Sequence, residues 1–434
     1  MDPFTLGIIG VIALVVLVFA GVRVFYAAAI VGLLGLVSIV GWDAGAGMIG
    51  TIPHSKAVTY TLSVLPMFIL IGFLAFHAGL TEALFDAGRK WIGWVPGGLA
   101  VATVMAATGF AAVSGASTAT AAVFARTAIP DMLKYGYDRR LAAGVVAAGG
   151  TLATLIPPSA LLVIYAIIVE ESVGALLVAG FLPGLVSALI YVVLIVLMAT
   201  FKPSLGRPIR GFTWGQRMRS LPGTLPIVAV VIIIFSAMYY GWATPTEAGA
   251  LGAFVVFVLA LLKGMRWTSL REALLETAKL TVMIFSIIWG VLAFVRFLGF
   301  AGLPEAFAQW VIHLPLPPLA IMIGILLFYA VLGMFMDAIG MLLLTLPVVY
   351  PAVIGLGYDP IWFGIIVVKM AEVCLITPPI GLNCFVVNGV RPDIPLSDVF
   401  RGIGPFFVAD VITIGVLLAF PEIVLWLPRT MNMG

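Results

Sequence analysis

Charge is scarce in this chain. Only 9% of its 434 residues are Asp, Glu, Lys or Arg, whereas soluble domains have about 25%. Hydrophobic residues make up 63% of the sequence, and the mean hydropathy is +1.23. A water-soluble fold cannot bury so much apolar surface, and apolar runs long enough to span a bilayer recur along the chain. The composition therefore predicts an all-α, multi-pass membrane protein whose surplus apolar surface faces the lipid bilayer.

Cysteine and histidine are also rare. The two cysteines, Cys374 and Cys384, lie in apolar segments and predict neither a disulfide framework nor a metal site. The three histidines, His54, His77 and His313, have no metal-ligand spacing. The sequence has no HExxH motif, no GxGD motif and no phosphate-binding GK[ST] loop, so it does not favour an intramembrane enzyme or an ATPase. We predict no catalytic residues, no cofactor and no nucleic-acid partner.

The apolar runs predict ten full crossings. The N-terminal segment lacks a basic start and a small-residue cleavage site, so it is interpreted as the first crossing. The crossings are expected at 4–22, 24–40, 58–80, 141–168, 174–200, 222–241, 247–263, 280–299, 360–389 and 404–427. Two further apolar stretches, 97–124 and 318–350, are each too short for two full crossings, which need about 40 residues.

The distribution of basic residues indicates what these two stretches do. If the N-terminus is outside and neither stretch crosses, all but four of the 22 basic residues fall on the cytoplasmic side. The exceptions are Lys56 and Arg429 outside and Arg296 and Lys369 within membrane segments. A full crossing by 97–124 would place later basic loops on the wrong side. Both stretches are therefore predicted to be re-entrant hairpins, and an ordinary tilted helix is the alternative.

The sequence contains an internal repeat. Gly-Tyr-Asp at 136–138 and Pro-Pro at 157–158 recur at 357–359 and 378–379, so both motifs return at one common offset without a gap. Each copy follows a predicted hairpin, and five crossings separate the two hairpins. An odd number of crossings gives the copies opposite orientations, which is the inverted-repeat pattern of many secondary transporters.

The two Pro-Pro pairs lie midway through long apolar runs. Proline removes a backbone donor and clashes with the preceding turn, so each run is predicted to be a broken helix. In lipid, the freed backbone groups need partners. A cation would satisfy the carbonyls, and an anion would satisfy the amides of the new helix N-terminus. The predicted hairpin tips, GFAAVSGASTATAA and GMFMDAIGM, bring small hydroxyl residues and Asp337 toward these breaks.

Two ionisable residues lie inside one predicted crossing. Lys369 and Glu372 are three residues apart and can share a helix face. They are either functional groups or a mutually neutralising pair packed against protein. Arg296 is expected to extend toward the interface.

The chain resembles the large membrane subunit of tripartite ATP-independent periplasmic (TRAP) transporters. The resemblance runs through nearly the whole chain and is strongest at 111–185 and at LITPPIGLNCFVV, residues 375–387. It implies an elevator-type fold in which scaffold helices hold a mobile domain with two hairpins and two broken helices. The implied division is 1–95 (scaffold and arm), 96–200 (first transport repeat), 201–300 (second scaffold) and 301–434 (arm and second transport repeat).

The resemblance also implies sodium-coupled uptake of an organic acid. One sodium site is expected between the first tip and the first break, and another between the second tip and the second break. The corresponding residues are Ser114, Ser117, Ala153, Ile156 and Pro158 for the first, and Gly333, Cys374 and Thr377 for the second. The family often has glycine at the positions of Ala153 and Cys374. Expected substrate-binding residues are Ser117, Thr118, Ser159, Asp337, Thr377 and Asn383, with Asp337 suited to cation attraction or gating.

The implied setting is the bacterial inner membrane. The implied partners are a small four-helix membrane subunit (Q type) and a periplasmic substrate-binding protein (P type). Two alternatives remain at this point: a sodium/anion symporter that works without a binding protein, and a passive assembly subunit.

Overall fold

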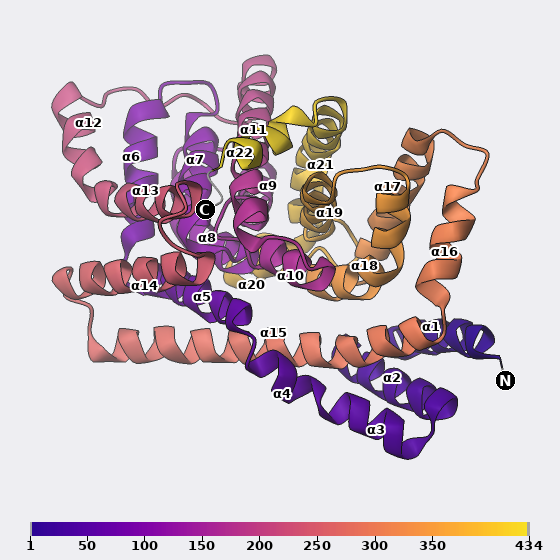
Figure 1. The fold of residues 1–434 in the computed structure, drawn as a ribbon. Coiled ribbons are helices and arrows are strands. Elements are labelled where there is room, and N and C mark those ends of the chain that lie inside the picture. The colour runs from indigo at the N-terminus through magenta and orange to yellow at the C-terminus, as the bar shows by residue number, and fades with distance from the viewer. Residues whose placement is uncertain (1, 432–434) are drawn as a thin grey trace.

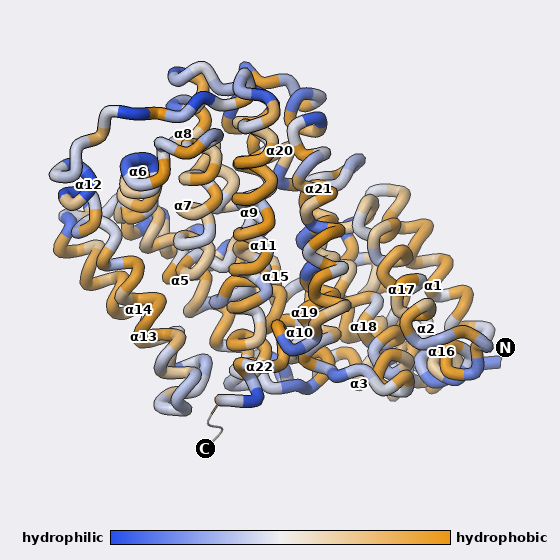
Figure 2. The backbone as a smooth tube through the Cα atoms, turned by 90° about the horizontal axis from the view of Figure 1, so that it is seen from above, coloured by the Kyte–Doolittle hydropathy of each residue, from blue (hydrophilic) through white to orange (hydrophobic). Residues whose placement is uncertain are grey.

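The computed structural model describes residues 2–431 and contains helices but no β-strand in that range. Figure 1 shows the helices packed into one assembly, and Figure 2 shows apolar residues along most of them. Within the described residues, six helices are long and apolar enough to cross a membrane, or seven if one bent pair is a single span. The all-helical membrane fold predicted from composition is confirmed.

The first half of the chain runs from α1 to α11. Its elements are α1 (Pro3–Phe19), α2 (Val24–Val40), α3 (Trp42–Gly50), α4 (Ile52–Ala57), η1 (Tyr60–Ser63), α5 (Val64–His77), α6 (Leu80–Ile92), α7 (Gly98–Ser114), α8 (Ser117–Lys134), α9 (Arg139–Thr151), η2 (Leu152–Thr154), α10 (Ala160–Val169) and α11 (Val173–Phe201).

The second half runs from α12 to α22. Its elements are α12 (Trp214–Ser220), η3 (Leu221–Gly223), α13 (Leu225–Tyr239), α14 (Pro245–Leu262), α15 (Trp267–Phe300), α16 (Leu303–Ile312), α17 (Pro318–Gly333), α18 (Ala338–Gly355), α19 (Pro360–Cys374), α20 (Leu382–Val390), α21 (Leu396–Ala419) and α22 (Glu422–Thr430). The long α15 packs against α2 and α5 and crosses the lower part of Figure 1, above α3 and α4.

The helix boundaries confirm the repeat. The offset found in the sequence carries both ends of α8 onto both ends of α18. The helices α9 and α19 each precede a Pro-Pro break, and α10 and α20 each follow it. The helices α6 and α16 each begin after a glycine in the left-handed region, Gly79 and Gly302. The two copies therefore share their order of arm, hairpin, broken helix and closing helix.

Both predicted hairpins are pairs of packed helices. In the first, α7 and α8 are joined by Gly115 and Ala116, and Gly115 takes a positive φ of 59° that favours glycine. In the second, α17 and α18 are joined by residues 334–337. Their re-entrance from one side of the bilayer stays a prediction, as does the division of the chain at residues 95, 200 and 300.

Several boundaries differ from the sequence prediction, and two short helices were not expected. The last crossing was expected at 404–427, but α21 ends at Ala419 and a separate helix, α22, follows. Pro421 lies between them and has no backbone donor with which to continue the helix. The helices α3 and α4, between the second and third crossings, were not predicted because this stretch combines glycines with polar residues.

Candidate functional site

The first hairpin tip lies directly on the first helix break. A Cβ built on Gly115 would overlap the carbonyl oxygen of Pro158, so no side chain fits between tip and break. Ser114 is buried beside the tip, and its Oγ lies 3.0 Å from Oγ1 of Thr120. Backbone carbonyls and hydroxyls are therefore concentrated at this contact, as the proline and SGAS motifs predicted.

The first break is fully enclosed. Helix α9 ends at Thr151, α10 begins at Ala160, and residues 155–159 between them are buried. Both arms of the hairpin, α7 and α8, pack against η2, which contains Ala153. The structure thus brings the tip residues Ser114 and Ser117 to the segment that holds the other three residues expected at the first sodium site, Ala153, Ile156 and Pro158.

The second tip and the second break also meet. A Cβ built on Gly333 would overlap Cys374 Sγ, so this glycine packs directly against the cysteine side chain at the end of α19. Thr377 lies in the break, half-buried, and its hydroxyl donates to the Val373 carbonyl over 2.7 Å. The structure places Gly333 beside Cys374, and the thiol fills space between tip and break that a glycine at 374 would leave open.

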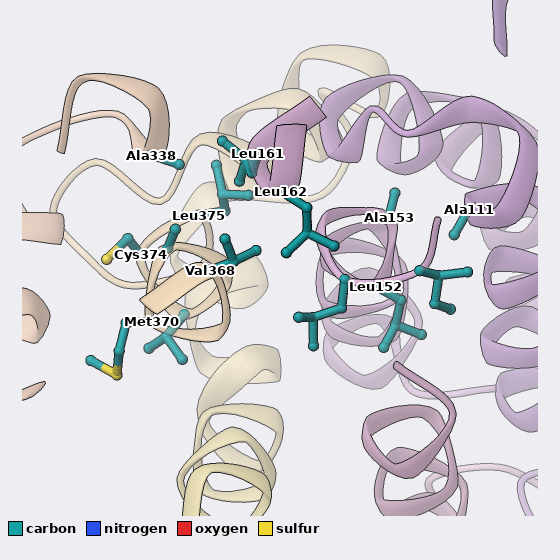
Figure 3. Packing of buried hydrophobic residues seen from close by; sticks show 14 of the residues in the cluster. Ala111, Leu152, Ala153, Leu161, Leu162, Ala338, Val368, Met370, Cys374 and Leu375 are labelled. Atoms are coloured by element: carbon teal, nitrogen blue, oxygen red, sulfur yellow. The ribbon is translucent and has the colours of Figure 1, made fainter. Parts of the chain in front are cut away.

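The helix that follows each break packs against the hairpin of the other repeat. Helix α10 of the first repeat packs against α18 of the second, and α20 of the second packs against α8 of the first. Figure 3 shows Leu161 and Leu162 of α10 between Ala153 of the first break and Leu375 of the second. Side chains of α10 therefore lie between the two breaks.

Each repeat caps only one of its two central helix starts. In the first repeat, Ser159 caps α10 by accepting from the Leu162 amide, whereas no side chain caps α8. In the second repeat, Asp337 caps α18 by accepting from the Gly340 amide, whereas no side chain caps α20. The uncapped starts belong to α8 and α20, the two helices that pack together across the repeats.

These two uncapped starts lie on one turn of α9. The Ser117 carbonyl at the start of α8 would be 2.9 Å from a Cβ on Gly150, and Asn383 at the start of α20 donates from Nδ2 to the Ala147 carbonyl over 3.1 Å. Ala147 and Gly150 are separated by about 4.5 Å of helix rise. The positive ends of two helix dipoles therefore converge, which is suited to binding an anion. At α20 the Asn383 amide already donates to the Leu375 carbonyl over 3.0 Å.

The expected substrate residues differ in their surroundings. Ser117 and Thr118 are half-buried in the first turn of α8. Ser159 is buried and occupied as a cap, and its hydroxyl also donates to the Thr154 carbonyl. Asn383 is fully buried, and its Oδ1 has no hydrogen-bond partner in the protein. An unpaired acceptor suits a donor or a cation better than a carboxylate oxygen.

The buried charges form a larger group than the sequence analysis predicted. Lys369 and Glu372 do share a helix face, with 2.9 Å between Nζ and Oε1, but Asp410 on α21 also lies 2.7 Å from the same Nζ. The sequence analysis weighed Lys369 and Glu372 as a pair and missed Asp410. The available signal was that Asp410 is the single charge in the apolar run 402–420.

The other singled-out residues have ordinary structural roles. Arg296 donates from Nη1 to the Met48 carbonyl, which ties α15 to α3. Cys374 and Cys384 are free and buried, as expected for core residues. Within residues 2–431, no group of three His, Cys, Asp or Glu side chains could hold a metal ion.

Comparison with known proteins places this geometry in a family. The sequence matches the family described as "Tripartite ATP-independent periplasmic transporter, DctM component" over residues 9–423. It is 36% identical to the C4-dicarboxylate TRAP transporter large permease protein DctM of Pseudomonas aeruginosa, covering 86% of this chain and 88% of that protein. It is 29% identical to the sialic acid TRAP transporter large permease protein SiaM of Vibrio cholerae, covering 85% and 86%.

A solved structure with a related fold is the YdaH transporter of Alcanivorax borkumensis. It superposes with a TM-score of 0.60 over 89% of this chain and 91% of that chain, at 13% sequence identity, and so bears on the fold alone. The family match and the relatives together show the family to which the chain belongs. The chain belongs to the DctM family, the large membrane permease subunits of tripartite ATP-independent periplasmic transporters.

Proposed function

We propose that this chain is the membrane-carrier subunit of a sodium-coupled secondary transporter that imports an organic acid delivered by a periplasmic binding protein. The observation that carries the proposal is the contact of each hairpin with a helix break, Gly115 on Pro158 and Gly333 on Cys374. Such contacts place the backbone groups of the tips and breaks next to each other inside a membrane fold, where unpaired backbone groups are costly to bury.

The cargo is an anion of the carboxylate class. The starts of α8 and α20, which no side chain caps, supply two positive dipole ends, and Ser117 and Thr118 add hydroxyl donors. Relatives are named for C4-dicarboxylates and sialic acid, and others for ectoine and 2,3-diketo-L-gulonate. A site built mainly from helix dipoles and small hydroxyls is compatible with such a range because it recognises negative charge rather than the shape of one substrate.

Sodium is the coupling ion in this proposal. The carbonyls and hydroxyls around Ser114, Ser117, Ala153, Ile156 and Pro158 form the first site, and those around Gly333, Cys374 and Thr377 form the second. Hard cations take oxygen ligands, which both tips and breaks provide. Because each site lies between a tip and a break, ion binding would hold each hairpin closed.

Transport is proposed to follow an elevator mechanism with two partners. The hairpins and broken helices would move against helices such as α2 and α5, which both pack on α15. A relative named isethionate TRAP transporter permease protein DctMQ matches 79% of this chain over only 54% of its own length. That greater length supports a Q-type membrane partner for this chain, and the P-type binding protein would deliver the cargo.

Reconstituted uptake tests the proposal. Proteoliposomes holding this chain and its small subunit, supplied with loaded binding protein, should take up a C4-dicarboxylate only with an inward sodium gradient. Ser117→Ala should lower uptake severalfold. Thr127→Ala is the matched control, because its hydroxyl donates to the Val123 carbonyl on the same helix away from the tip.

Three outcomes would contradict the proposal. Uptake that is independent of sodium would remove the coupling. Full uptake without the binding protein would favour the symporter that works alone. Wild-type uptake in both Ser117→Ala and Thr377→Ala would favour a passive assembly role.

A further inference from the structure

The segment that follows α11 and includes most of α12 concentrates positive charge. Residues 202–219 contain five basic residues and no Asp or Glu. We call this segment the basic strap, and its basic residues are Lys202, Arg207, Arg210, Arg217 and Arg219. Four of them are exposed, and Arg217 is half-buried. Within residues 2–431, none of the five belongs to an ion pair, so the chain does not neutralise this charge.

Backbone hydrogen bonds hold the basic strap in place. They join the Asp138 amide to the Leu205 carbonyl (3.0 Å), the Gly97 amide to the Gly206 carbonyl (3.1 Å) and the Ile209 amide to the Gly93 carbonyl (2.7 Å). Gly206 is buried, and a Cβ built on it would lie 2.5 Å from the Tyr137 ring. The strap thus crosses the end of α6, the start of α7 and the turn before α9. A surface that is already ordered loses little entropy when it binds a ligand.

Helix α12 is fixed on α6 by tryptophan contacts. The rings of Trp91 and Trp214 have centroids 5.5 Å apart, and Trp91 Nε1 donates to the Arg217 carbonyl over 3.1 Å. The Arg217 guanidinium lies 5.8 Å from the centroid of the Trp214 ring. Figure 1 shows α12 beside α6. A cation and an aromatic ring are therefore held next to each other on this short helix.

The basic strap lies at the depth of a membrane surface, because it connects two apolar helices. Helix α11 ends at the exposed Phe201, and α12 leads into α13 through a bend of 49°. Trp94 and Trp214 are 57% and 65% exposed, and exposed tryptophans mark the interface between lipid and water. Met218 lies one turn after Trp214 and is also exposed. Apolar side chains therefore lie beside the cations of the strap.

Charge and apolar exposure together favour a lipid as the ligand. Arginine and lysine bind phosphate oxygens. Basic segments next to a membrane helix are typical of contacts with anionic lipids, and the distribution of basic residues predicts that this one is cytoplasmic. A soluble phosphate would contact the cations but would leave Trp214 and Met218 without an apolar partner.

We propose that the basic strap and α12 form a binding surface for anionic lipids of the cytoplasmic leaflet. The cations of the strap bind the headgroup phosphate, and Trp214 and Met218 contact the acyl chains. Because the strap is bonded to the end of α6 and the start of α7, a bound lipid stabilises the base of the first hairpin. This surface does not depend on the proposed carrier function.

Photolabelling of the full-length protein in neutral detergent tests the surface without a transport assay. A phosphatidylglycerol analogue with a photoreactive group near the headgroup should label peptides that contain residues 202–219, as read by mass spectrometry. An analogue of phosphatidylcholine should label them far less. The double variant Arg207→Gln, Arg210→Gln should lower labelling of the strap by about tenfold, because each cation near an anionic lipid surface contributes to binding. Raised ionic strength should also lower it.

The matched control is the double variant Lys263→Gln, Arg266→Gln. It removes the same charge from exposed residues between α14 and α15, where Glu272 and Glu276 follow. Labelling of the strap should stay at the wild-type level in this variant. Thermal unfolding without added lipid should be the same in both double variants, because none of the four side chains belongs to an ion pair.

Competition separates a lipid from a soluble anion. Unlabelled phosphatidylglycerol should displace the photoreactive analogue, whereas glycerol phosphate and heparin should not. Displacement by either soluble anion would assign the strap to a soluble acidic ligand and overturn the proposal.

Three further results would overturn it. Equal labelling by the phosphatidylcholine analogue would show that charge does not select the lipid. Labelling that avoids residues 202–219 would place the lipid elsewhere. An equal loss of labelling in the two double variants would show that only the net charge of the protein matters. The wild-type results decide the question even if a variant does not fold.

Discussion

The two repeats share one plan but close their sites differently. In the first, the tip meets the break backbone to backbone, at Gly115 and Pro158, and the break itself is buried. In the second, a cysteine side chain stands between Gly333 and α19, and residues 378–380 of the break are exposed. The first contact is therefore rigid, whereas the second can be adjusted by one side chain.

The largest effect should come from Gly115→Ala. The new Cβ would overlap a carbonyl oxygen that no rotamer can move, at a φ of 59°. We expect uptake to fall by about tenfold or more, since small misplacements at a binding site cost this much. Gly136→Ala is the matched control, because it has a similar φ of 75° and no heavy atom within 4 Å of the new Cβ. Equal uptake in the two variants would show that uptake does not depend on the contact between Gly115 and Pro158.

Gly333→Ala should also impair uptake, but a second substitution should rescue this loss. The new Cβ would collide with the Cys374 side chain rather than with backbone. The double variant Gly333→Ala, Cys374→Gly should therefore recover most of the uptake lost in Gly333→Ala, with Cys374→Gly alone as the reference. No variant that removes a side chain should rescue Gly115→Ala. If the double variant stays as impaired as the single, the second contact is as rigid as the first.

Substitutions of Asp337 should have a smaller effect. They distinguish its role as the cap of α18 from a role in cation attraction or gating. As the cap of α18, it can be replaced by asparagine but not by alanine. We expect Asp337→Ala to lower stability by about 1 kcal/mol and Asp337→Asn to leave stability and uptake close to wild type, measured by thermal unfolding in detergent and by uptake. A loss of sodium-driven uptake in Asp337→Asn would instead assign the charge to cation attraction or gating.

The smallest effect should be the same in both repeats. Gly136 and Gly357 are counterparts with φ of 75° and 87°, and a Cβ on either would meet nothing within 4 Å. Alanine at either should cost about 1 kcal/mol of stability through left-handed strain alone and leave uptake unchanged. Clearly unequal losses of thermal stability would show that the repeats differ even where their surroundings are open.

Features fixed by local sequence could be predicted, and features fixed by tertiary contact could not. The prolines at 157–158 and 378–379 predicted both helix breaks because two consecutive prolines remove two backbone donors and clash with the preceding turn. The common offset of the two motifs predicted that α8 and α18 are counterparts. By contrast, Asp410 joins Lys369 only through the packing of α21 on α19, and the capping choice of Ser159 and Asp337 depends on side-chain direction.

Thr151 of α9 and Glu372 of α19 occupy the same position in the two repeats, and their side chains lie 2.9 Å apart. This contact has a consequence for how the two halves diverge after an inverted duplication. A residue on the symmetry axis faces its own copy, so a substitution in one half changes the surroundings of both. Here the pair has become unequal, one hydroxyl against one carboxyl, at the spacing of the repeat. Any later exchange of either residue therefore acts on two halves of the molecule at once.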